Sequence, residues 1–197
     1  MNKQNNMIIF LLFVLVLLVG CAQPSEDLAK ADIVESTANA GEVMSDGSKI
    51  IDTTLSTFEF EGYAVGKSHA GTFDVYSGSL SYDGETLVAA NGVIDATTVN
   101  TGIKGLDTHL KADDFFNVAV NPTIEFTSSA ISYDAQTGNG TATGSLLFNG
   151  VTNDVTFPVM VTSEGMSTEF LLDTTPFNMK NAGVNKEVRI AFTFVAE

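Results

Sequence analysis

Short runs of alternating apolar and polar residues make up most of the chain from residue 49 to residue 197. The run TFEFE at residues 57–61 places two phenylalanines on one face of an extended strand and two glutamates on the other. Asp83-Gly84 and Asn149-Gly150 are dipeptides typical of tight hairpin turns. The same alternation recurs at residues 72–76, 124–127, 156–161 and 188–194. The pattern predicts an all-β, mainly antiparallel domain of about eight strands, arranged as a barrel or a sandwich.

Residues 108–116 (THLKADDFF) depart from this alternation. Leu110, Lys111 and Ala112 favour helix over strand. We therefore predict one short helix here, covering an open end of the barrel or an edge of the sheet.

The N-terminal residues have the pattern of a targeting signal. A basic start at Lys3 precedes an unbroken apolar run at residues 7–19, which is short for a membrane span but suits the core of a signal peptide. It ends in Leu18-Val19-Gly20-Cys21, which resembles the lipobox of prokaryotic lipoproteins. We predict that residues 1–20 are removed and that Cys21 is lipidated, which anchors an extracytoplasmic protein to a membrane. An ordinary cleaved signal or a single anchor helix is the alternative.

Residues 21–48 are rich in acidic, small and polar side chains and lack apolar periodicity. We predict a flexible acidic tether here, and leave open a short helix around residues 28–35. The chain thus divides into a signal peptide (1–20), a tether (21–48) and one β-domain (49–197).

Charge and composition exclude several classes of function. Acidic side chains outnumber basic ones by 24 to 9, and the formal net charge of −15 argues against nucleic acid binding. The single cysteine excludes an intramolecular disulfide and a cysteine-based zinc site. The two histidines, His69 and His109, are too few and too far apart to suggest a metal site or a histidine-based triad. We expect a protein that is not an enzyme and has no cofactor or metal.

The longest motif of the domain is DTHLKADDFFNV at residues 107–118, followed by PTIEFT at residues 122–127. HAGTF at residues 69–73 precedes them, and GSLLFNGVT at residues 144–152 follows. In this order and at this spacing the motifs resemble those of the YceI-like family, from near Ile51 to the C-terminus. The chain departs from the family at Leu106 and Thr174, where members often carry an arginine that could pair with a ligand head group.

The resemblance implies an eight-stranded, lipocalin-like antiparallel barrel that binds an isoprenoid-type lipid, such as a polyprenyl or quinone chain. Such a barrel has room for packed side chains or for one slim ligand. Since every barrel needs inward apolar residues, core packing explains each single phenylalanine about as well as ligand binding does. The candidate ligand-binding residues are Phe58, Phe60, Phe73, Val75, His109, Phe115, Phe116, Ile124, Phe126, Phe157, Val159, Phe170, Phe177, Ile190 and Phe192.

Some of these residues have alternative roles. Phe115 and Phe116 on the predicted helix either plug one end of the barrel or gate its mouth, and Phe177 is a candidate for the rim. Asp107 and His109 either contact a lipid head group or cap the helix and satisfy loop backbone groups. An acid–base role for this pair is a third, enzymatic alternative.

Two functions remain open at this point. The first is storage or carriage of the lipid, without transforming it, by a membrane-anchored barrel. The alternative is a surface or periplasmic interaction protein whose barrel is filled by its own side chains. The resemblance also leaves open a homodimer.

Overall fold

The computed structural model describes residues 22–36, 47–180 and 183–197. The predicted signal peptide and the predicted lipidation site Cys21 lie outside these residues. Within the described ranges, no helix is both long enough and apolar enough to cross a membrane.

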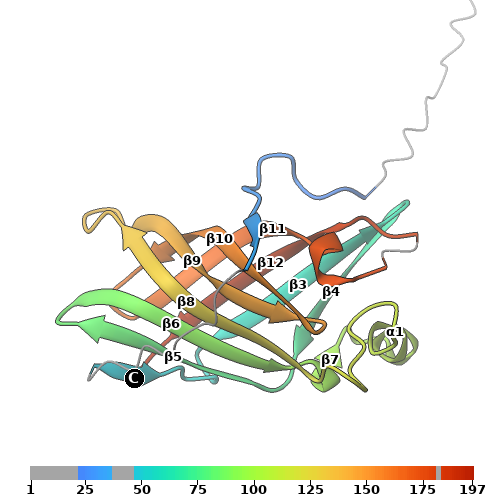
Figure 1. The fold of residues 1–197 in the computed structure, drawn as a ribbon, viewed down its shortest axis with the longest axis horizontal. Helices are drawn as coiled ribbons and strands as arrows, with labels where there is room; N and C mark the ends of the chain where they lie inside the picture. The colour runs from blue at the N-terminus through green and yellow to red at the C-terminus, as the bar shows by residue number, and fades with distance from the viewer. Residues whose placement is uncertain (1–21, 37–46, 181–182) are drawn as a thin grey trace, which may run out of the picture.

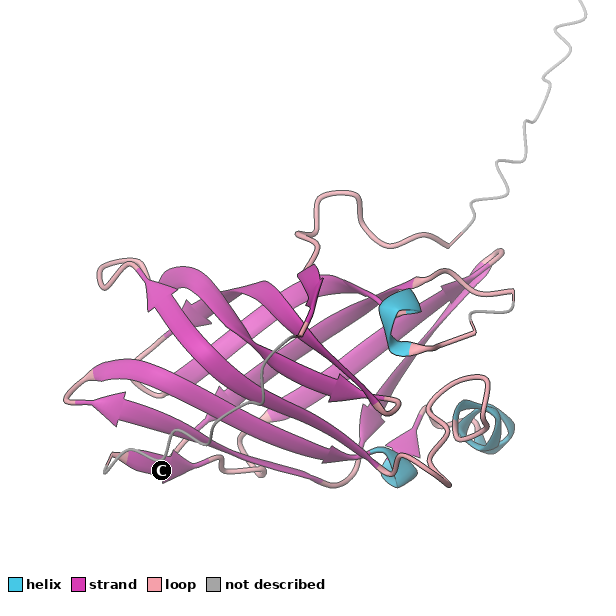
Figure 2. Cartoon of the chain, in the orientation of Figure 1, coloured by secondary structure: helices cyan, strands magenta, loops and turns pink. Residues whose placement is uncertain are grey.

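The described residues form one twelve-stranded, mainly antiparallel sheet that curls into an open barrel with one short α-helix at its end (Figures 1 and 2). The strands follow the order β2-β5-β6-β8-β9-β10-β11-β12-β3-β4-β7, and β1 pairs with β10. Their bounds are β1 (Asp32–Glu35), β2 (Ser48–Ile50), β3 (Thr57–Ala64), β4 (Lys67–Phe73), β5 (Tyr76–Asp83), β6 (Thr86–Asp95), β7 (Val99–Asn100), β8 (Thr123–Tyr133), β9 (Asn139–Phe148), β10 (Val151–Val161), β11 (Gly165–Asp173) and β12 (Glu187–Val195).

This architecture confirms the predicted antiparallel barrel, although the strand count is higher than predicted. Three of the strands, β1, β2 and β7, have only 4, 3 and 2 residues, too few to produce a clear alternating pattern. The structure also divides one extended stretch into β4 and β5. The longer strands match the predicted ones because their inward side chains alternate with solvent-facing ones.

β4 and β5 join the two ends of the sheet. Only Asp74 and Val75 separate these strands, yet β4 pairs with β3 whereas β5 pairs with β6. Beside this corner, β2 pairs with β5, and Ile51 forms an isolated bridge with Ala196. The sheet therefore curls back on itself, and its inward side chains share one hydrophobic core.

β10 and β11 separate after only two residue pairs, which end at Met160–Ser167. Pro158 in β10 has no N–H to donate to a ladder, and its carbonyl accepts a hydrogen bond from the hydroxyl of Thr168. β1 pairs with residues 153–156 of β10, in the part of the strand that β11 leaves free. The N-terminal segment thus covers an edge that would otherwise expose unpaired backbone groups.

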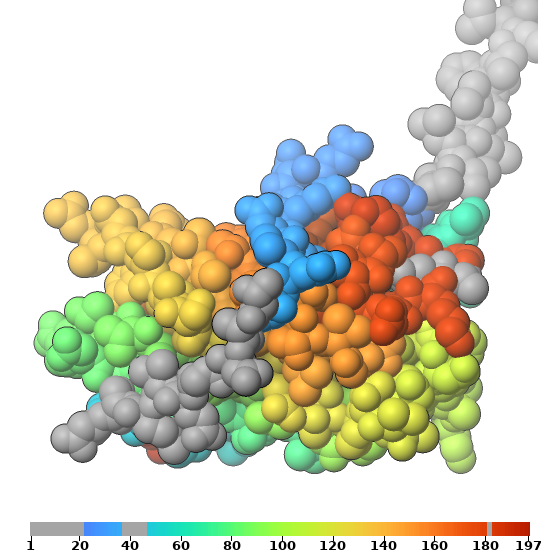
Figure 3. All heavy atoms as spheres, viewed as in Figure 1, coloured from blue at the N-terminus to red at the C-terminus, as the bar shows by residue number. Residues whose placement is uncertain are grey.

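The described part of the predicted tether lies on the barrel (Figure 3). Residues 32–35 form a strand, whereas the sequence had allowed a short helix around residues 28–35. Leu171 exchanges backbone hydrogen bonds of 2.9 Å with Ala29 and Ala31. Closer to the N-terminus, the Gln23 side chain accepts a hydrogen bond of 3.5 Å from Asn185. The free edge of β10 explains the difference, because β-branched Ile33 and Val34 suit a strand once a partner is present.

The α-helix, α1 (Lys104–Leu110), lies at one end of the barrel next to β7 (Figure 1). It starts earlier than the predicted residues 108–116 because Gly102, at φ +72°, turns the chain just before it. After Leu110 the chain continues in turns, and the Phe116 N–H donates to the Leu110 carbonyl at 3.0 Å. Phe115 and Phe116 are therefore not helical, and both are buried in the core.

Candidate functional site

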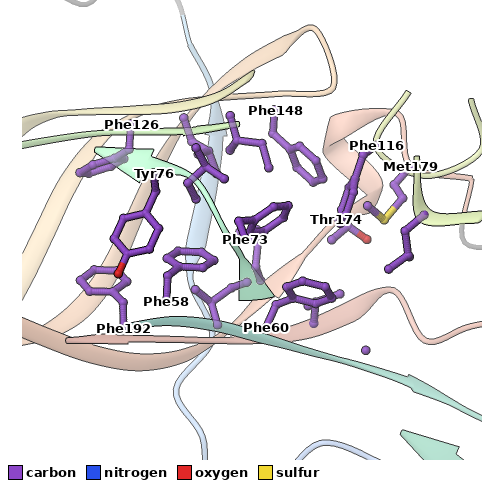
Figure 4. Close-up of a pocket in the computed structure, with 18 of the residues that line it drawn as sticks. Phe58, Phe60, Phe73, Tyr76, Phe116, Phe126, Phe148, Thr174, Met179 and Phe192 are labelled. Carbon is purple, nitrogen blue, oxygen red and sulfur yellow. The ribbon is translucent and has the colours of Figure 1, made fainter. Parts of the chain in front are cut away.

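The barrel encloses an apolar cavity of about 430 Å³ (Figure 4). This volume falls within the range of roughly 300–1,000 Å³ that is usual for small-molecule sites. Inward side chains of β3, β4, β6, β8, β10, β11 and β12 line it, and Leu106, His109 and Leu110 of α1 reach its end. The barrel is therefore hollow along part of its length.

Phenylalanine is the most frequent residue type in the cavity wall (Figure 4). Phe157 and Phe170 stack with ring centroids 4.7 Å apart. Phe73 connects two groups of rings, with centroids 5.9 Å from Phe58 and 5.6 Å from Phe116. Such offset and tilted pairs hold one another in place, so the rings present a firm apolar surface.

Two tyrosines, Tyr63 and Tyr76, also line this wall. Tyr76 donates a hydrogen bond of 2.8 Å from its hydroxyl to the Ser56 carbonyl, and burial raises the pKa of its phenol. The hydroxyl is therefore satisfied by the protein, and the ring contributes apolar surface to the cavity.

Most of the predicted site residues come together around the cavity. The wall includes residues from widely separated parts of the sequence because successive strands place every second side chain inward. The predicted residues found there are Phe58, Phe60, Phe73, His109, Phe115, Phe116, Ile124, Phe126, Phe157, Phe170, Ile190 and Phe192.

Three predicted residues are not among the residues that line the cavity. Val75 lies at the corner between β4 and β5, where its side chain is 54% exposed. Val159 is on the inward face of β10 but is buried in the core without lining the cavity. Phe177 is 0% exposed and packs behind Phe148, with ring centroids 5.6 Å apart, so it is a buried plug and not part of a rim.

Sequence reasoning missed several wall residues, among them Leu146 and Phe148. Both lie at alternate positions on strands and were available from the same pattern that identified Phe192. Leu106 and Thr174 also line the cavity. Family members often carry an arginine at these two positions. In this chain the cavity instead meets the aliphatic side chain of Leu106 and the small polar side chain of Thr174.

Asp107 and His109 do not form an acid–imidazole pair. The Asp107 carboxylate accepts hydrogen bonds from the Thr101 N–H at 2.8 Å and from the Thr101 hydroxyl at 2.6 Å. These hydrogen bonds hold the pKa of Asp107 below its ordinary value. His109 instead packs edge-on against Phe115, with ring centroids 4.8 Å apart. Asp107 therefore fixes α1 to the loop that follows β7.

The wall near α1 includes polar side chains on the hairpin of β3 and β4. His69 pairs across the hairpin with Gly62, and Lys67 pairs with Ala64. A Cβ atom at Gly62 would meet no atom within 4 Å. The small partners leave open space beside the two basic side chains, and we call this part of the cavity, lined by Gly62, Ala64, Lys67, His69 and His109, the mouth.

Comparisons with known proteins match the domain that contains this cavity. Residues 50–196 match the model of the YceI-like domain. The chain belongs to the YceI-like family. It is 32% identical to the protein YceI of Escherichia coli O157:H7 over 122 residues, which cover 61% of this chain and 59% of that protein. The chain thus spans less than two thirds of the length of this relative.

Two solved structures have the same fold. BcnA of Burkholderia cenocepacia matches 75% of this chain and 99% of its own, with a TM-score of 0.68 and 24% identity. A polyisoprenoid binding domain from Saccharophagus degradans matches 77% of this chain and 98% of its own, with a TM-score of 0.57 and 20% identity. At these identities the similarity concerns the fold of the YceI-like domain.

Proposed function

We propose that this YceI-like protein binds an isoprenoid-type lipid inside its barrel and stores or carries it without transforming it. The single observation that carries the proposal is the cavity of about 430 Å³, walled by phenylalanine and aliphatic side chains. A lipid chain is the ligand that such a wall suits, because it offers apolar contacts along its whole length. The name of the Saccharophagus degradans domain supports the choice of a polyisoprenoid.

The energetics of such binding follow from the burial of carbon atoms. Each fully buried isoprene unit, with five carbons at about 0.8 kcal/mol each, gains roughly 4 kcal/mol in transfer free energy. Ordering of the chain and loss of translational freedom oppose a large part of this gain. The methyl branches and double bonds of an isoprenoid match the flat ring faces of pairs such as Phe157–Phe170.

The site of action that we propose is a membrane surface outside the cytoplasm. The support comes from the apolar run at residues 7–19 and the lipobox-like Leu18-Val19-Gly20-Cys21. Lipidation of Cys21 would hold the barrel beside the bilayer from which an isoprenoid is taken.

Native mass spectrometry of the gently extracted full chain tests the binding proposal. We expect a mass above that of the delipidated chain, and an extract that contains a prenyl lipid. After delipidation, the protein should take up a prenyl alcohol in preference to a straight-chain saturated alcohol of equal carbon number. Equal native and delipidated masses, with no uptake of either alcohol, would contradict the proposal and favour an interaction protein.

A further inference from the structure

The barrel wall is discontinuous between β10 and β11. These strands pair only at Met160–Ser167 and Val161–Met166, near one end of the barrel. On its other side, β10 pairs with β9 along residues 151–160. The edges of β10 and β11 that face each other are therefore not joined over most of their length, and we call this gap the seam.

Residues 29–35, which we call the closing segment, fill the seam (Figure 1). The first part of the segment joins β11, because Leu171 exchanges backbone hydrogen bonds of 2.9 Å with Ala29 and Ala31. The second part is β1, which pairs antiparallel with residues 153–156 of β10. The segment thus crosses from one edge of the seam to the other and completes the wall there.

The seam borders the cavity directly. Val155 of β10 and Phe170 and Leu172 of β11 all line the cavity, and they lie on the two strands that the seam separates. Ile33 of the closing segment is the pairing partner of Val155, so the two side chains share the inward face. Ile33 also packs against the core. At the seam, the closing segment therefore separates the cavity from solvent.

The closing segment is held less firmly than the longer strands of the wall. Most of its side chains are exposed, and within the segment only Ala31 and Ile33 pack partly against the core. Lys30 forms an ion pair of 2.5 Å with Glu187, but the lysine side chain is 64% exposed, so solvent weakens the attraction. Water can replace the backbone hydrogen bonds when the segment leaves. Such a segment opens locally at a much lower cost than unfolding of the whole barrel.

We infer that the closing segment is a gate whose release opens a lateral portal between β10 and β11 for the prenyl chain. This inference rests on the proposed function, because it assigns the route by which the lipid reaches the cavity. A long chain that entered at the mouth would have to thread lengthwise through the barrel. A portal in the side wall instead admits the chain sideways, along Val155, Phe170 and Leu172.

A disulfide across the seam tests the gate. Val34 and Asp154 are pairing partners in β1 and β10, and the Cα separation of about 4.5–5.5 Å in such pairs suits a disulfide. In a Cys21→Ser background, Val34→Cys/Asp154→Cys carries only these two thiols. Ser145→Cys/Asp154→Cys is the matched control, because it joins β10 to β9, where the wall is continuous. Transfer of a radiolabelled prenyl alcohol between phosphatidylcholine vesicles and the delipidated protein is timed in the oxidised and reduced forms.

We expect the oxidised seam variant to take up and release the alcohol at least about tenfold more slowly than its reduced form. Its Kd should not change, because a gate alters the rates and not the bound state. The control should exchange lipid at the same rate in both forms. Equal rates in both forms of the seam variant would overturn the inference and leave the proposed function intact, whereas a lack of uptake by the parent protein as well would overturn both.

Ala31→Pro provides the converse test. It removes the N–H that donates to the Leu171 carbonyl, so the gate should open more often and lipid exchange should accelerate several-fold. Faster amide hydrogen exchange at Leu171, whose N–H donates to Ala29, should accompany this change. Ala29→Pro is the control, because Ala29 contributes its carbonyl to the seam and retains it. Lipid exchange at the parent rate in Ala31→Pro would contradict the inference.

Discussion

Replacement of Gly62 by tryptophan would narrow the mouth of the cavity without disturbing the barrel. Gly62 lines the cavity, and a Cβ atom there meets nothing within 4 Å. Its backbone is not in the left-handed region that only glycine adopts readily. An indole at this position therefore has open space before it and needs no adjustment of the backbone.

The size of the effect follows from the space that the indole takes. If it displaces one isoprene unit from the cavity, the ligand loses roughly 4 kcal/mol of transfer free energy. The isoprene unit outside the cavity regains conformational freedom, and this gain offsets about half of the lost transfer free energy. The net loss of about 2 kcal/mol corresponds to a rise in Kd of roughly 30-fold.

Titration of a short-chain prenyl alcohol into the delipidated protein measures this change. Gly105→Trp is the matched control, because Gly105 is equally open but lies on α1 outside the cavity wall. The free energy of unfolding of both variants should stay within about 0.5 kcal/mol of the parent protein. An unchanged Kd in Gly62→Trp, or an equal loss in Gly105→Trp, would refute the placement of the ligand.

Three further predictions concern the plug, an ion pair and the proposed anchor. Phe177→Ala should lower the free energy of unfolding by about 3–5 kcal/mol in chemical denaturation, because its ring is fully buried, with little effect on lipid affinity. Burial favours a raised pKa for Asp173, but hydrogen bonds from Lys186 and Thr175 outweigh it and hold the pKa below its ordinary value. The carboxylate thus stabilises the fold above about pH 4, and this contribution should disappear as the pH falls through the lowered pKa, so that stability curves of the parent and Asp173→Asn converge in acid. Cys21→Ser should move the protein from the membrane fraction to the soluble fraction, and unchanged retention would count against lipidation.

The barrel was predictable because its long strands keep strict alternation. Phe58, Phe60, Phe157 and Phe192 all lie at inward positions, and a period of two is the most direct consequence of strand geometry. The short strands left no such signal. β1 forms only because β10 offers a free edge beside Pro158, and that edge depends on the path of a strand far away in the sequence.

The site was less predictable than the fold, because alternation does not distinguish a cavity wall from a filled core. Val159 and Phe157 share one face of β10, yet only Phe157 lines the cavity. Phe177 was misplaced since a proline-containing loop suggests exposure, whereas its carbonyl and ring are held by Asn149 and Phe148. The basic mouth was missed because Lys67, His69 and His109 come to line one cavity only after the barrel closes.

The hydrogen bond between Gln23 and Asn185 has a consequence for how the protein would stand on a membrane. Asn185 lines the cavity, and two positions along the chain separate Gln23 from Cys21. If Cys21 carries the lipid anchor that we propose, the anchor would attach within about 7 Å of chain length from Gln23, because two residues span at most that distance. Only a short linker would then separate the barrel from the membrane, and its lipid would enter from the bilayer without crossing open water.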